Sequence, residues 1–136
     1  MILADTGPLV ALFDPADRDH ARCVNRLREI AEPLVTTIPV LTEAFHLLRP
    51  GSRGGAGLMR FAGEGGVGLW HFDDASHPRA FELMRRYNNL PMDLADASLV
   101  VAAEMLGTRR ILTLDRKEFH TYRIRRGHRN LAFEIV

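Results

Sequence analysis

Four acidic residues occupy positions at which a folded α/β chain would bring carboxylates together. Asp5 and Asp115 each follow a short apolar run that reads as a strand, whereas Glu43 and Asp96 lie near the starts of expected helices. The carboxyl ends of parallel strands and the starts of the following helices lie on one side of a sheet. We therefore expect these four acids to share one pocket. Asp93 belongs with them, because residues three apart lie about 60° apart around a helix.

Carboxylates held close together raise one another's pKa and oppose the compact state, so such a cluster favours a bound cation. Mg²⁺ or Mn²⁺ prefers oxygen ligands, keeps several waters and suits a site that also takes substrate phosphate. A metal site of this kind suits the hydrolysis of a phosphodiester bond, in which the ion activates the attacking water. Our hypothesis assigns Asp5, Asp96 and Asp115 to a principal metal, Glu43 to the attacking water, and Asp93 to a second metal. Each acid alone also has a structural interpretation as a helix cap, a solvated charge or a turn former.

The elements that must position these acids alternate between strands and helices. Strands are expected at the N-terminus and at 34–37, 67–72, 110–115 and 131–136, and helices at 7–13, 16–32, 39–48, around 80–87 and at 92–104. The alternation predicts one α/β domain over residues 1–136, with a mainly parallel central sheet and helices on both faces. No second domain is expected at this length.

Residues 51–68 contain eight of the eleven glycines, which predicts a loop-rich connection with at most a short helix around residues 58–62. The pattern G-x-G-x-x-G at 63–68 does not indicate a dinucleotide site. Such a site needs the glycines after a strand and at the opening of a helix, whereas here they lead into an expected strand.

Overall charge is nearly balanced, with 18 Lys and Arg against 17 Asp and Glu, but its distribution is uneven. Residues 109–129 hold eight basic and only two acidic residues, which makes one end of the chain cationic. The single cysteine, Cys23, shares a helical face with apolar residues and reads as core packing. Since the sequence shows neither a disulfide framework nor a membrane-spanning run, we expect a cytoplasmic protein without a membrane partner.

Four short motifs, taken together, resemble the PIN-domain family and in particular the small VapC-type toxins of bacterial toxin–antitoxin pairs. The resemblance covers essentially the whole chain, in the family's order, and its motifs are residues 3–9, 42–45, 94–99 and 112–115 with Phe119. It implies an endoribonuclease dependent on Mg²⁺ or Mn²⁺, with Asp5, Glu43, Asp96 and Asp115 as its acidic quartet and Asp93 as an accessory acid. Thr6 and Thr113 match hydroxyl positions that assist the site. A cognate antitoxin and a homodimer are the partners that the resemblance implies.

RNA must also be held beside the acidic pocket, and the cationic segment starts directly after Asp115. We expect phosphates to contact basic residues there, namely Arg116, Lys117, Arg123, Arg125 and Arg126. The same segment also fits a solvated face or a landing site for an acidic antitoxin, and both interpretations stay open. His46 lies one turn after Glu43, so it is either a further metal ligand or a partly exposed, hydrogen-bonded histidine.

Two other classes of protein compete with a nuclease. A phosphoacceptor signalling domain would need an acid pair near the first strand and a lysine at a late strand end, but the only lysine, Lys117, follows an acid instead. A catalytically inactive PIN-like module that binds RNA or protein is the second alternative, because a fold can lose its chemistry. The full set of acids favours the enzyme.

Overall fold

The computed structural model describes all residues from Met1 to Val136, and its centre is a five-stranded sheet. The strand order is β3-β2-β1-β4-β7 and every neighbouring pair is parallel. The bounds are β1 (Ile2–Ala4), β2 (Leu34–Thr37), β3 (Gly68–Trp70), β4 (Arg110–Leu112) and β7 (Glu134–Ile135). The parallel sheet confirms the predicted fold class.

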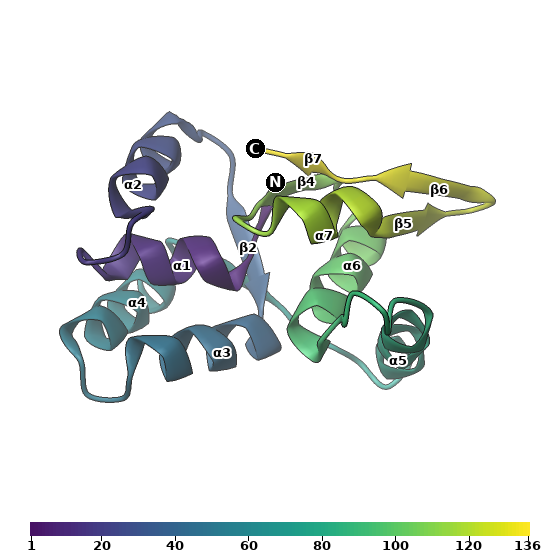
Figure 1. The fold of residues 1–136 in the computed structure, drawn as a ribbon, viewed down its shortest axis with the longest axis horizontal. Coiled ribbons are helices and arrows are strands. Elements are labelled where there is room, and N and C mark those ends of the chain that lie inside the picture. The colour runs from purple at the N-terminus through teal and green to yellow at the C-terminus, as the bar shows by residue number, and fades with distance from the viewer.

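Seven helices flank this sheet, and Figure 1 shows α1 to α4 on one side of the strands and α5 to α7 on the other. Their bounds are α1 (Thr6–Phe13), α2 (His20–Glu29), α3 (Ile38–Leu48), α4 (Arg53–Gly63), α5 (Ser76–Arg86), α6 (Leu94–Leu106) and α7 (Arg116–Thr121). None of them combines the length and the apolar character needed to cross a bilayer.

Side-chain caps explain where the helices nearest the sheet edge begin. Asp5 caps α1, Thr37 caps α3 and Asp93 caps α6, each accepting a hydrogen bond from a backbone N–H in the first turn. Pro39 sits in the first turn of α3, where a missing N–H costs nothing. Three helices therefore start at the edge where the parallel strands end.

The glycine-rich segment differs from the expected loop, because residues 53–63 form the full helix α4. Its glycines allow close packing against α1. A Cβ on Gly54 would lie 2.7 Å from the carbonyl oxygen of Phe13, and one on Gly57 would lie 2.9 Å from the Phe13 ring. Ser52 caps the helix and Leu58 is fully buried, so tertiary contacts outweigh the low helix propensity of glycine.

The last part of the cationic segment and the residues that follow it fold as an antiparallel hairpin, separate from the main sheet. Its strands are β5 (Arg123–Arg126) and β6 (Arg129–Ala132), joined by a turn in which Gly127 has a φ of 61°. The expected final strand is thus divided between β6 and β7. In Figure 1 the hairpin extends outward beside α6.

The main core lies between the sheet and helices α1, α3, α5 and α6, and it contains 24 buried apolar residues. Helix α6 is buried on nearly all sides, since eight positions between Ala95 and Ala103 are buried. Asp96 is the one acid in its first turn. Burying an ionised acid costs free energy unless hydrogen-bond donors or cations lie beside it.

Candidate active site

Asp5 is the most buried acid of the predicted cluster, with 2% of its surface exposed. Ala4 pairs with Leu112 across β1 and β4, so Asp5 and Thr113 leave the sheet at the same edge. The backbone N–H of Asp5 donates to the carbonyl of Leu112 at 3.0 Å. Its carboxylate accepts from the Thr6 backbone N–H at 2.8 Å and from the Thr113 hydroxyl at 2.7 Å. The two central strands therefore hold this carboxylate in a fixed orientation.

Thr113 links Asp5 to Asp115. While its hydroxyl donates to Oδ2 of Asp5, the same oxygen accepts from the backbone N–H of Asp115 at 3.0 Å. Asp115 itself is exposed and precedes α7 without capping it through its side chain. The predicted neighbourhood of Asp5 and Asp115 thus follows from the adjacency of β1 and β4, with one threonine between them.

Asp96 projects from the first turn of α6, and its Oδ2 accepts a hydrogen bond from the buried hydroxyl of Tyr122 at 3.0 Å. Asp93 lies just before the helix, where its Oδ1 caps the backbone N–H of Asp96 at 2.8 Å. Behind them the hydroxyls of Thr37 and Ser98 lie 2.6 Å apart and tie α6 to the end of β2. These contacts set the position of the helix start relative to the strands.

Glu43 and Asp93 line a shared cavity of about 570 Å³ between the starts of α3 and α6. Its other lining residues include the apolar Ile38, Pro39 and Leu94. His46 is exposed and lies on the rim of the same cavity. The structure therefore brings Glu43 to the acidic side of the sheet, where its charge acts on Asp5.

The electrostatics of the cluster depend on burial and on like charges. The pKa of Asp5 is raised to about 7: burial is the largest cause, the charges of Asp115 and Glu43 add to it, and the hydrogen bonds from Thr113 and Thr6 oppose it. The pKa of Asp96 is also raised to about 7, first by burial and then by the charges of Asp93 and Asp5. The pKa of Asp115, which is exposed, is raised by partial desolvation first and then by Glu118 and Asp93. Ionising all of them together is therefore unfavourable without a counter-charge.

The donor set fits a hard divalent cation that keeps part of its water shell. No three His, Cys, Asp or Glu side chains lie close enough together to hold a metal ion by themselves. Mg²⁺ needs only one or two protein carboxylates, and every candidate donor here is a carboxylate or hydroxyl oxygen. The hydroxyl of Thr6, next to Asp5 in the chain, is buried without any hydrogen-bond partner in the protein. A buried hydroxyl of this kind calls for a water or ligand oxygen.

The predicted basic residues occupy different positions relative to the acids. Arg116 and Lys117 are exposed in the first turn of α7, directly after Asp115. Arg123 donates through Nη1 to three carbonyls at the end of α7, and Arg126 donates to the carbonyl of Gly107 at 2.9 Å. Gly107 caps the far end of α6, a helix of 13 residues and about 20 Å. The hairpin thus leads away from the acids.

Sequence reasoning missed Tyr122, which lies 26 positions from the acid that it contacts. Its hydroxyl faces a carboxylate, and burial together with the Asp96 charge raises the pKa of the phenol well above its usual range. A signal was present in the spacing of Phe119 and Tyr122, one helical turn apart and both fully buried. That spacing indicates core packing, whereas only the fold shows that the phenol ends at Asp96.

Comparisons with known proteins agree with this fold. Residues 2–124 match the PIN domain family. The chain is 32% identical to Ribonuclease VapC26 of Mycobacterium tuberculosis over 124 residues, which cover 90% of this chain and 92% of that protein.

Two solved structures share the fold. One is the crystal structure of Mycobacterium tuberculosis VapC20, described as a toxin that cleaves the sarcin–ricin loop. It has a TM-score of 0.77 at 20% identity and covers 85% of this chain and 90% of that one. The other is a toxin–antitoxin complex from Klebsiella pneumoniae, with a TM-score of 0.66 at 16% identity over 89% of this chain and 92% of that one.

Proposed function

The chain belongs to the PIN domain family, and from this premise we propose that it is a divalent-metal-dependent endoribonuclease, the toxin of a toxin–antitoxin pair. The proposal rests on the placement of Asp5, Asp96 and Asp115 at one edge of the sheet, where the charge of Asp115 raises the pKa of Asp5 and the charges of Asp5 and Asp115 raise that of Asp96. A relative named as a ribonuclease supports the choice of RNA as the substrate.

Asp5, Asp96 and Asp115 would hold Mg²⁺ or Mn²⁺, with Asp93 assisting from the start of α6. When bound, such an ion polarises the scissile phosphate and makes water a stronger acid. Thr113 keeps the Asp5 carboxylate oriented, because its hydroxyl donates to Oδ2. Tyr122 favours the ionised form of Asp96 by donating to it.

Glu43 is the proposed general base. It lines the cavity together with the apolar residues Ile38 and Leu94, and its carboxylate would accept a proton from the attacking water. The oxygen of that water forms the new bond to phosphorus, the bond from phosphorus to the 3′-oxygen breaks, and the leaving 3′-oxygen takes up a proton from the solvent. The products are a 5′-phosphate and a 3′-hydroxyl.

Basic residues next to the acids would hold the RNA backbone, since guanidinium groups bind phosphate through two parallel hydrogen bonds. Arg116 and Lys117 are nearest to Asp115 in the chain. Arg125 is exposed on β5 and would contact RNA further from the acids. Arg123 and Arg126 have protein carbonyls as partners and would contribute mainly charge.

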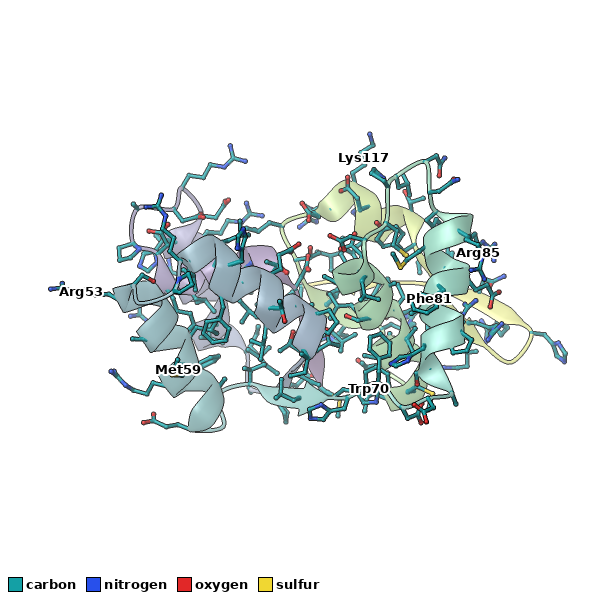
Figure 2. All side chains as sticks on the ribbon, turned by 90° about the horizontal axis from the view of Figure 1, so that it is seen from below. Arg53, Met59, Trp70, Phe81, Arg85 and Lys117 are labelled. Carbon is teal, nitrogen blue, oxygen red and sulfur yellow. The ribbon has the colours of Figure 1, made fainter.

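An antitoxin and a second copy of the chain are the proposed protein partners. Two separate exposed apolar regions are available to them. One lies on α3 and α4, where Leu47 is 57% and Met59 is 66% exposed; the other lies around β3 and α5, where Phe81 is 49% exposed. Figure 2 shows Met59 and Phe81 in different parts of the molecule, so one partner need not exclude the other.

The decisive experiment incubates the purified, metal-free protein with structured RNA, with and without Mn²⁺ or Mg²⁺, beside the variants Asp96→Asn and Asp74→Asn. Asp74 is an exposed acid outside the cluster and serves as the control. We expect metal-dependent cleavage that Asp96→Asn abolishes and Asp74→Asn retains. Equal metal-dependent cleavage by all three proteins would refute the site. RNA binding without any cleavage would favour the inactive module instead.

A further inference from the structure

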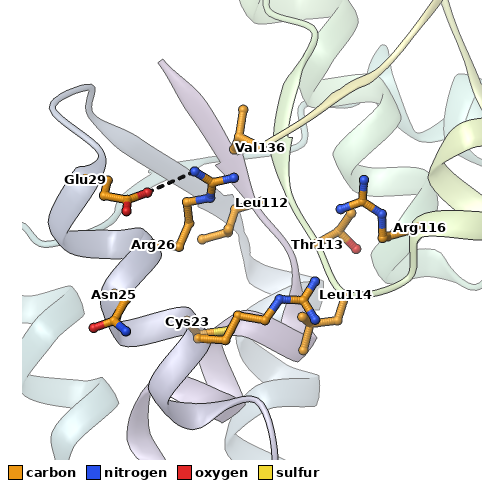
Figure 3. Close-up of a pocket in the computed structure, with 10 residues that line it drawn as sticks. Cys23, Asn25, Arg26, Glu29, Leu112, Thr113, Leu114, Arg116 and Val136 are labelled. Atoms are coloured by element: carbon orange, nitrogen blue, oxygen red, sulfur yellow. Dashed lines mark hydrogen bonds and ion pairs between the residues drawn. The ribbon is translucent and has the colours of Figure 1, made fainter.

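A second cavity, of about 380 Å³, lies between α2 and the end of β4, and none of the clustered acids lines it. Three arginines line it: Arg22 and Arg26 from α2 and Arg116 from α7. Cys23 and Leu112 form part of its apolar wall. Figure 3 shows Arg26 and Arg116 on opposite sides of the cavity, so their guanidinium groups can approach one ligand from two directions.

The arginines that line this cavity have weak ion-pair partners or none. Arg26 pairs with Glu29 at 3.0 Å and Arg22 pairs with Asp19 at 3.4 Å, both as neighbours on the surface of one helix. Such exposed pairs contribute little stability and exchange readily for a better partner. Arg116 makes no ion pair or hydrogen bond through its guanidinium group. Among the lining residues, Glu29 is the only acid against three cations.

Thr113 connects this cavity to the acidic site. It lines the cavity, and its hydroxyl also donates to Asp5 and accepts from the Asp115 backbone. One residue thus lines the cationic cavity and contacts two acids of the anionic cluster. An RNA strand carries a phosphate on every nucleotide, so a strand with one phosphate at the acids must place another nearby. The acids alone would repel that second phosphate.

We propose that the cavity formed by Arg22, Arg26 and Arg116 binds a backbone phosphate of the RNA strand next to the one that is cleaved. The inference rests on the proposed function and assigns Arg22 and Arg26 a role in holding the substrate. Guanidinium groups match the geometry of phosphate oxygens, and the apolar wall formed by Cys23 and Leu112 strengthens these contacts by limiting access of water. The competing occupant is a carboxylate of a protein partner. A protein does not carry an anion on every residue, so it does not supply evenly spaced anions to both the cavity and the acidic site as an RNA strand does.

The test measures binding of a single-stranded oligoribonucleotide, taken from RNA that the protein cleaves, to full-length protein carrying Asp96→Asn. Within that background we compare three variants. They are the double variant Arg22→Gln/Arg26→Gln, the single variant Arg116→Gln, and the control Arg28→Gln. Arg28 is exposed on α2 but lies outside the cavity, so its variant removes one charge without touching the proposed site. Thermal unfolding of each variant establishes that the fold is retained.

We expect the double variant and Arg116→Gln to weaken binding by roughly tenfold, whereas Arg28→Gln changes it little. The slope of log affinity against log salt should become shallower by about 0.7 for each phosphate that the variant no longer binds. Oligonucleotides with one neutral methylphosphonate linkage locate the bound phosphate. One linkage beside the cleaved bond should weaken binding to the parent protein and have no further effect in the cavity variants.

Four outcomes overturn the proposal. Cavity variants that bind every oligonucleotide as Arg28→Gln does would leave the cavity without a phosphate. Cavity variants that keep RNA binding but lose an acidic antitoxin would assign the cavity to a protein. If the native chain cleaves RNA through Asp96 and the same arginine substitutions, made in the native chain without Asp96→Asn, leave cleavage equally fast, only the cavity assignment is wrong. If the native chain neither binds nor cleaves RNA, the proposed function fails, and this inference with it.

Discussion

The hydroxyl of Tyr122 donates a hydrogen bond of 3.0 Å to the carboxylate of Asp96, and this contact joins the end of α7 to the start of α6. It opposes the rise in the pKa of Asp96 that burial and Asp93 produce. The contact therefore helps to keep a half-buried acid ionised near neutral pH. A residue that touches no substrate can in this way govern the pH range of the site.

Tyr122→Phe should shift the acid limb of the pH–rate profile upward by about one unit, because ionised Asp96 loses a charge-assisted hydrogen bond. Cleavage at pH 6.5 should fall about tenfold, with a much smaller loss at pH 9. Tyr87→Phe is the control, since Tyr87 packs against the Tyr122 ring at 5.1 Å between centroids and makes no contact with Asp96. Equal losses at all pH values would assign Tyr122 a purely structural role.

Stability without metal should decrease as the pH rises from about 4 to about 7. The folded pKa values of Asp5 and Asp96, about 7, exceed the ordinary value of 3.8, so the folded state binds more protons across this range. Above pH 7 the carboxyl groups of Asp5 and Asp96 are ionised, and the free energy of unfolding is lowered by the full cost of holding their charges in the folded state. The midpoint of thermal unfolding should drop by several degrees between pH 5 and pH 8.

Asp96→Asn provides the check on that pH dependence, because it removes one ionisable group while keeping its size. The variant should unfold at a higher temperature than the native chain at pH 8, with a smaller difference at pH 5. A native chain that is equally stable at both pH values would contradict the raised pKa values.

Added Mn²⁺ should raise the unfolding temperature by several degrees at pH 8 and hardly at all at pH 5, since the cation binds ionised carboxylates. Differential scanning fluorimetry with and without a chelator measures this difference. Asp96→Asn should reduce the shift, whereas Asp74→Asn should keep it. A shift of the same size in Asp96→Asn would place metal binding elsewhere.

Gly54→Ala should destabilise the fold by about 1–3 kcal/mol, because the new Cβ would lie 2.7 Å from the Phe13 carbonyl oxygen and 2.9 Å from Leu48. Gly63→Ala is the matched control at the other end of α4, where a Cβ meets nothing within 4 Å. It should be neutral or slightly stabilising. Chemical denaturation measures both, and similar effects at the two positions would show that α1 and α4 do not constrain the glycines.

Local patterns were sufficient to predict most of the sheet. The runs at 2–4, 34–37 and 110–112 form parallel strands because each is short and contains branched side chains. The adjacency of Asp5 and Asp115 depended on whether β1 and β4 are neighbours, which no local pattern determines. The register of Ala4 with Leu112 supplies that information.

Two elements lay beyond sequence reasoning for a physical reason. The glycines at 54 and 57 weaken a helix locally, but they allow α4 to approach Phe13, and this tertiary gain decides the outcome. The hairpin of β5 and β6 depends on partners outside it, since the Glu104 carboxylate accepts from the Arg125 backbone N–H at 2.9 Å. Tyr122 was missed likewise, because its partner Asp96 lies far away in the chain, and so were Arg22 and Arg26, because only the fold brings them into one cavity with Arg116.

The placement of β1 between β2 and β4 has a consequence for the order of synthesis. Asp5 leaves the ribosome 108 residues before Thr113, whose hydroxyl orients its carboxylate. A growing polypeptide therefore carries this acid over that length without the strand that orients it. If the protein is a toxin to its own cell, this order of assembly withholds activity from every incomplete chain until β4 is made.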